Sequence, residues 1–132
     1  MNKRSLLMVV VAMLLCLMLM PITASAYYGT PDPSKSYITH GGGSGSPLVV
    51  TVYALDSSYN PASGPLSASI RYNEMGQYYT GTLYLTNQYP WSGIYEYTFY
   101  PQYPSYGMKQ VTQIDINFGS FTLTKSTSFF IW

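Results

Sequence analysis

The sequence predicts an all-β domain, a sandwich of about seven short antiparallel strands that follows a cleaved signal peptide. Three observations lead to this prediction. Apolar and polar residues alternate with a period of two through most of the chain after residue 47. Turn residues interrupt the alternation at intervals of about ten residues. Tyrosine, which favours strands, occurs 15 times, always after residue 26.

The N-terminus has the three parts of a secretory signal peptide. Lys3 and Arg4 give it a positive start, and residues 6–20 form an almost unbroken apolar run that is short for a membrane span. A proline ends the run, and a small-x-small triplet then predicts cleavage after Ala26. An uncleaved anchor helix is the alternative. We expect residues 1–26 to be removed and the mature protein to be secreted, to the cell surface or the medium.

The remainder of the chain is long enough for one domain with one core. Its four basic and five acidic side chains nearly balance, so the clustered Lys and Arg that nucleic acids and anionic lipids require are missing. The single cysteine, Cys16, lies in the signal peptide, and we therefore expect no disulfide in the mature protein. The expected partners are other copies, surface proteins or polysaccharide, and neither nucleic acid nor, after cleavage, a membrane.

Residues 27–46 form an N-terminal arm and linker ahead of the domain, residues 47–132. A Gly/Ser run closes this segment and is a flexible linker by composition. Before it lies one short stretch with strand character: Ser36, Tyr37, Ile38, Thr39 and His40. We predict that this arm pairs with an edge strand of a neighbouring copy, so that copies assemble head to tail. Pairing with its own domain, or disorder, is the alternative.

The first two strands of the domain are defined by their alternation. In residues 48–55 the even-numbered residues are apolar and share one face. In residues 66–72 the even-numbered residues again share a face, beginning with Leu66, while Ser and Arg occupy the other. Residues 56–65 between them are rich in Asp, Ser, Asn, Pro and Gly, which predicts a turn region.

A hairpin turn is predicted at residues 73–76, where Gly76 supplies a positive φ. The next strand, residues 77–85, has inward-facing positions at Tyr79, Leu83 and Leu85. Gly81 inside this strand predicts a bulge or a close neighbour.

The later elements follow the same logic. They are a loop at 86–93, a strand at 94–100, a loop at 101–107, a strand at 108–118 and a strand at 121–132. Tyr95, Tyr97 and Phe99 alternate with polar residues, so we expect the aromatic rings in the core. The alternation breaks near Val111, which predicts a bulge or two separate segments.

Several of these segments resemble one family of modules. The matching motifs are Val50-x-Val52, Asp56-x-x-x-Asn60-Pro61, Gly64-Pro65-Leu66-x-Ala68-x-Ile70, Gly93-Ile94-Tyr95-x-Tyr97-x-Phe99 and Ser128-Phe129-Phe130-Ile131. This pattern resembles the immunoglobulin-like modules of bacterial and archaeal surface proteins, of the invasin-type and transthyretin-like kinds. The resemblance covers residues 48–132 and implies an immunoglobulin-like sandwich that serves as a spacer, adhesin or binding module. Those modules usually occur within longer chains, whereas this one stands almost alone. This difference argues against a role as a pure spacer.

The residues needed for catalysis are not assembled in this sequence. His40 is the only histidine, and it lies in the arm, away from any predicted ordered shell. The five carboxylates are scattered, and one His without Cys does not make a zinc site. We therefore expect no catalytic residue, no metal and no cofactor.

Two loops share a Gln-Tyr-Pro start followed by an aromatic residue and Gly, at residues 88–93 and 102–107. Aromatic side chains in exposed loops stack on sugars or contact proteins; packing over the ends of the core is the alternative. Because one strand separates the two loops, we expect them at opposite ends of the domain. The candidate ligand-binding residues at one end are Tyr59, Asn87, Tyr89 and Trp91.

The expected function is non-enzymatic surface structure or adhesion, with a carbohydrate-binding module as the alternative.

Overall fold

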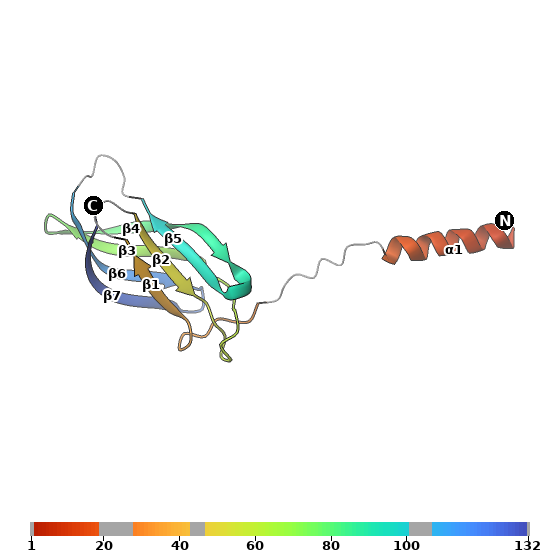
Figure 1. The fold of residues 1–132 in the computed structure, drawn as a ribbon, viewed down its shortest axis with the longest axis horizontal. Helices are drawn as coiled ribbons and strands as arrows, with labels where there is room; N and C mark the ends of the chain where they lie inside the picture. Colours follow the sequence, from red (N-terminus) through yellow and green to blue (C-terminus); the bar gives the residue numbers. More distant parts are fainter. Residues whose placement is uncertain (1, 19–27, 43–46, 101–106, 132) are drawn as a thin grey trace.

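The computed structural model describes residues 2–18, 28–42, 47–100 and 107–131. Within them the chain has one α-helix and seven antiparallel strands, so the prediction of a mostly β fold is confirmed (Figure 1). The elements are α1 (Lys3–Met18), β1 (Tyr37–Gly41), β2 (Leu48–Tyr53), β3 (Ser67–Glu74), β4 (Gln77–Tyr89), the 3-10 turn η1 (Pro90–Ser92), β5 (Ile94–Phe99), β6 (Lys109–Asn117) and β7 (Thr122–Ile131). No helix in these residues has the length and hydropathy that crossing a membrane requires.

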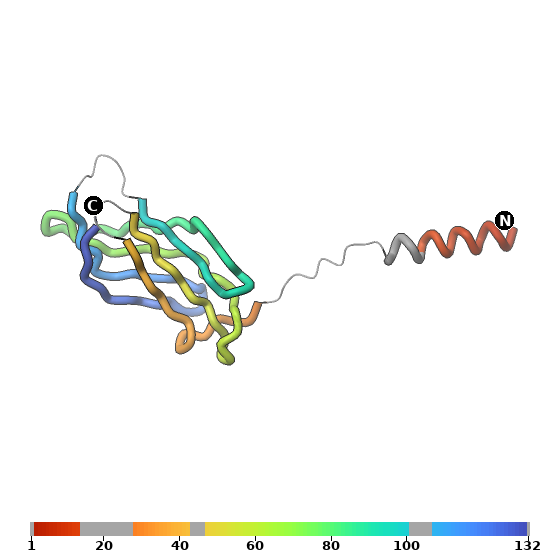
Figure 2. Tube along the Cα trace, in the orientation of Figure 1, coloured from red at the N-terminus to blue at the C-terminus, as the bar shows by residue number. Residues whose placement is uncertain are grey.

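The strands form one nearly closed sheet in the order β1-β2-β5-β4-β3-β6-β7. Strand β4 has 13 residues and pairs with β3 along its first part and with β5 along its last part. It therefore joins a first half-sheet (β1, β2, β5 and the end of β4) to a second half-sheet (the start of β4, β3, β6 and β7). At the other side β1 comes beside β7, seen in Figure 2 as the orange and dark blue strands.

One apolar core lies between the two half-sheets. The predicted alternation of residues 48–55 is confirmed, because its buried residues are Leu48, Val50, Val52 and Ala54. Tyr95, Tyr97 and Phe99 of β5 are buried as predicted. Burial raises the pKa of Tyr97 to about 12, with a smaller contribution from Tyr95. These phenols are therefore neutral core groups at physiological pH.

The predicted hairpin turn between β3 and β4 is present. Met75 and Gly76 have φ values of 52° and 83°, as a two-residue type I′ turn requires. The Asn73 side chain accepts a hydrogen bond from the Gly76 N–H at 3.0 Å and so stabilises the turn. Gly81 has the predicted close neighbour, because a Cβ added there would lie 2.5 Å from the Phe99 ring.

Strand β6 contains the irregularity that the sequence predicted near Val111. Arg71 of β3 pairs with Gln113, whereas the next residue, Tyr72, pairs with Val111. The intervening Thr112 is the extra residue of a bulge, and its hydroxyl donates to the Arg71 carbonyl at 3.2 Å. Because of this bulge, Val111 and Ile114 both point into the core.

Three details differ from the sequence prediction. Leu66 is 75% exposed, because it precedes β3; its N–H donates to the Asn117 carbonyl. Tyr79 and Leu85 are 44% and 46% exposed, since β4 runs along the side of the sheet, where the described residues form no layer over those positions. Residues 86–89, predicted as loop, continue β4 as far as Tyr89. Residues 101–106 of the predicted loop at 101–107 and the last residue, Trp132, lie outside the described residues.

Candidate functional site

Three of the four predicted ligand-binding residues come together where β4 ends. The Asn87 amide donates a hydrogen bond to the Tyr89 hydroxyl at 2.7 Å. The rings of Tyr89 and Trp91 meet at 5.7 Å between centroids with an angle of 81° between their planes. Trp91 is 69% exposed. The structure thus places a hydrogen-bonding amide beside an accessible aromatic pair.

Local backbone features position this group. Between Leu85 and Asn87 the pairing of β4 with β5 shifts by one residue, and the bulged Thr86 bonds through its hydroxyl to Thr98 at 2.8 Å. This bulge sends Asn87 and Tyr89 to the outer face of the sheet. The turn η1 then begins with a proline and ends at Gly93, whose φ is 68°. The tight turn leaves the Trp91 side chain on the surface.

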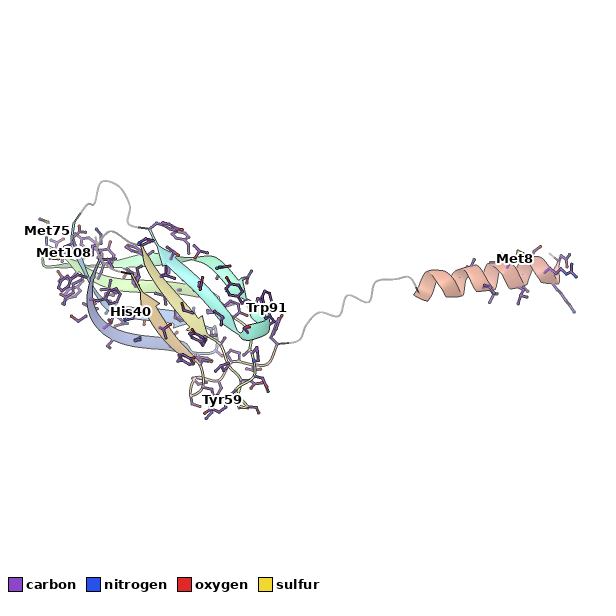
Figure 3. The ribbon with its side chains drawn as sticks, viewed as in Figure 1. Met8, His40, Tyr59, Met75, Trp91 and Met108 are labelled. Atoms are coloured by element: carbon purple, nitrogen blue, oxygen red, sulfur yellow. The ribbon has the colours of Figure 1, made fainter. Side chains whose placement is uncertain are left out.

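Tyr59, the fourth predicted residue, lies in a different loop. Figure 3 shows Tyr59 and Trp91 in separate loops, away from the end of the domain that carries Met75 and Met108. The Asp56 carboxylate accepts hydrogen bonds from the Ser58 and Asn60 N–H groups, and these bonds lower its pKa. Lys35 lies over the Tyr59 ring, with its Nζ 4.7 Å from the centroid. Tyr59 therefore belongs to an independent contact.

The predicted assembly arm is placed on the chain's own domain. Ser36 is buried, and its hydroxyl both donates to the Leu55 carbonyl and accepts from the Leu55 N–H. From Tyr37 onward the arm forms β1, which pairs with β2 from Tyr37 opposite Tyr53 to Gly41 opposite Val49. A role of residues 36–40 in assembly stays a prediction.

The contact between β1 and β7 is made by side chains, and we call it the seam. It consists of Ile38 and His40 on β1 with Lys125 and Phe129 on β7. Lys125 Nζ donates to the Ile38 carbonyl at 3.2 Å. The His40 and Phe129 rings stack at 4.3 Å with 11° between their planes. Burial, and then the charge of Lys125, hold the pKa of His40 below its ordinary value.

A row of side chains across the first half-sheet was missed by sequence reasoning. The register places Tyr37 opposite Tyr53, Tyr53 opposite Ile94, and Ile94 opposite Tyr89. Paired residues of antiparallel strands share a face, so these three Tyr side chains and one Ile side chain form a single row. We call it the aromatic row; Trp91 lies at its β4 end. Tyr37 and Tyr53 stack at 4.5 Å with 10° between their planes. The outward parity of Tyr53 was visible in the sequence, but its neighbours were not.

Lys109 was also missed. It is 2% exposed, and its Nζ lies 3.4 Å from a Glu74 carboxylate oxygen and 3.1 Å from the Gly107 carbonyl. A buried ammonium needs such partners. The bulge in β6 turns Lys109 inward. Its role is structural, because it links β3 to β6 at the end of the core.

Neither a cluster of metal-binding side chains nor a similarity to known proteins indicates a further site. Among the described residues, no three His, Cys, Asp or Glu side chains gather in a way that would hold a metal ion. No family model, curated protein or solved structure matches the chain.

Proposed function

We propose that this protein is exported and acts outside the cytoplasm as a non-enzymatic, immunoglobulin-like contact module in adhesion or surface structure. The strand order supports the immunoglobulin-like assignment. In that fold, strands A, B, E and D make one sheet and C, F and G the other. Numbered along this chain, the same order is β1-β2-β5-β4 followed by β3-β6-β7.

Export is supported by the N-terminal segment. The helix α1 begins at Lys3, next to Arg4, and is apolar from Leu6 onward. The predicted cleavage site, at residues 24–26, lies outside the described residues. N-terminal sequencing of the protein recovered from outside a producing cell tests this part: we expect the first residue to be Tyr27, and a product that retains Met1 contradicts cleavage.

The aromatic row is the observation that carries the contact function. Tyr37 and Trp91, at its two ends, are 48% and 69% exposed although both are large and partly apolar. Such side chains supply most of the binding energy of protein surfaces that act by contact. They stand on paired strands, which keep them in fixed positions without further ordering on binding.

Assembly through the N-terminal arm is the second candidate. It is favoured by the seam, since β1 pairs along its backbone with β2 alone and meets β7 through side chains. Assembly then requires that β1 leave its own β2 and pair with that of a neighbour. Light scattering of the secreted protein over a range of concentrations tests this: growing particles support exchange, and a constant monomer mass rules it out.

Retention on envelope material tests the contact function. Washed envelopes of the producing cells, incubated with the secreted protein, should bind it saturably. Trp91→Ala should release it, whereas Tyr59→Ala should not, because Tyr59 is 64% exposed but lies outside the aromatic row. Equal retention of the parent and the Trp91→Ala protein contradicts the proposed contact surface.

A further inference from the structure

The aromatic row runs beside a second row of opposite character. Two residues further along the strands, Thr39 pairs with Thr51, Thr51 with Glu96, and Glu96 with Asn87. We call these four the polar row. Because side chains two residues apart share a face of a strand, both rows lie on the outer face of the first half-sheet. The surface is thus an apolar strip bordered by hydroxyl, amide and carboxylate groups.

Both rows extend across four strands, from β1 to β4. Neighbouring strands are about 4.8 Å apart, so each row is roughly 14 Å long. This is the length of a short oligosaccharide rather than of a single sugar ring. The apolar strip is continuous, because the stacked Tyr37 and Tyr53 at one end and the Tyr89–Trp91 pair at the other are joined by Ile94.

The chemistry of the two rows matches that of a sugar chain. Sugar rings have C–H faces, which stack on aromatic side chains, and hydroxyl edges, which need hydrogen-bond partners. Trp91 offers the largest accessible ring. Asn87 uses its amide N–H on Tyr89, which leaves its carbonyl oxygen to accept from a ligand hydroxyl. The Glu96 carboxylate is a stronger, charge-assisted acceptor at the centre of the polar row.

The charge of the surface selects among carbohydrates. Glu96 is the only charged side chain in the two rows. An acidic polysaccharide would meet this carboxylate without a Lys or Arg in either row to offset it. A peptide partner would be expected to add a strand along a sheet edge, whereas both rows run across the strands on a sheet face. We propose that the outer face of the first half-sheet binds an extended neutral polysaccharide along the aromatic row; this rests on the contact function proposed above.

Affinity electrophoresis of the secreted protein tests this inference. Native gels would contain hydroxyethyl cellulose, xyloglucan, mannan or laminarin as neutral probes, and polygalacturonate as an acidic one. We expect at least one neutral polysaccharide to retard the protein and polygalacturonate to leave it unaffected. Retardation by polygalacturonate alone, or by none of the neutral probes, overturns the inference.

Variants locate the site on the same gels. Trp91→Ala should weaken the binding at least about tenfold, as expected for a dominant aromatic contact. Tyr37→Ala, at the far end of the row, should weaken it several-fold, and this effect shows that the ligand spans the strands. The matched control Tyr59→Ala should bind like the parent, and circular dichroism should show all three variants folded. Loss of binding in Tyr59→Ala equal to that in Trp91→Ala overturns the assignment.

Treatment of the envelopes separates this inference from the proposed function. Periodate, which oxidises sugars, should abolish retention of the protein, and protease should not. If protease abolishes retention and periodate does not, the contact module stands and its polysaccharide ligand is wrong. If neither parent nor variant is retained on untreated envelopes, the proposed contact function itself fails.

Discussion

The two sides of the nearly closed sheet are held together in different ways. On one side β4 pairs with β3 and then with β5, so backbone strand pairing joins the half-sheets, with one bulge at Thr86. On the other side β1 and β7 meet at the seam, through one side-chain hydrogen bond and one pair of stacked rings. The β4 side cannot open without breaking strand pairing, whereas the seam opens by moving side chains. We therefore expect the first local opening of the domain at the seam.

The largest expected effect comes from the β4 side. Gly81→Val would place a Cβ 2.5 Å from the Phe99 ring and 3.2 Å from that of Tyr72. Because both rings are packed in or against the core, overpacking should cost about 3 kcal/mol of the free energy of unfolding. Urea unfolding of the purified protein measures it. The control Thr82→Val, at the exposed neighbouring position, should change stability by less than about 0.5 kcal/mol; equal effects of the two variants would contradict the packing argument.

At the seam, Phe129→Ala should have a smaller and more local effect. The variant loses the stack with His40 and part of a half-buried ring, so we expect a loss of about 1–2 kcal/mol. Hydrogen exchange should show the amides of β1 losing more protection than those of β4. Phe130→Ala removes a ring from the opposite, exposed face of β7 and is the control. Uniform loss of protection in every strand after Phe129→Ala would show that the seam is not a separate opening unit.

The sequence predicted the two sides unequally well, because they depend on different kinds of information. The β4 side rests largely on local signals: the alternation in β5, the turn at Gly76 and the glycine at position 81 lie in or between neighbouring strands. The continuation of β4 through residues 86–89 was predicted as loop. The seam joins residues 38–40 to residues 125–129, and alternation alone does not pair segments that lie so far apart. For the same reason the sequence could not decide between the predicted pairing of the arm with a neighbouring copy and its alternatives, pairing with its own domain or disorder.

The candidate site shows the same limit. Asn87, Tyr89 and Trp91 are close in sequence, and sequence reasoning found them together. Tyr37 and Tyr53 entered the site through the register of β1, β2, β5 and β4. Tyr59 was grouped with them because its loop was expected at the same end of the domain, but the side chain contacts Lys35 instead. A sheet face collects residues from strands that are distant in sequence, so only the local part of the site was predictable.

A third variant tests the hydrogen bond of the seam. Lys125→Met keeps most of the side-chain length but removes the donor to the Ile38 carbonyl. We expect a loss on the order of 1 kcal/mol or less, because water can replace the donor at this partly exposed position. Hydrogen exchange of β1 should again report it. Arg71→Met, on the exposed side of β3, should leave β1 unchanged; equal changes in the two variants would argue against a specific contact.

The smallest effect is expected from pH and acts through His40. The pKa of this imidazole lies below its ordinary value of 6.5, first because burial disfavours the charged ring and second because Lys125 repels it. The unfolded chain therefore binds the proton more readily. The stability that His40 contributes is complete above about pH 6.5 and is lost as the pH falls through the folded-state pKa. Asp32 and Asp56 have pKa values lowered from 3.8, so their contribution is lost only in more acidic solution.

The urea midpoint should thus fall between about pH 7.5 and about pH 5 in the parent protein. His40→Phe keeps a ring on Phe129 and cannot be protonated, so its midpoint should stay nearly constant over this range. In Lys125→Met the fall should be shallower than in the parent, because one of the two causes of the lowered pKa is gone. If His40→Phe and the parent lose stability in parallel, the pH dependence arises elsewhere in the domain. The seam would then be held by ring packing and the Lys125 hydrogen bond without a contribution from His40 titration, and acid would leave β1 in place.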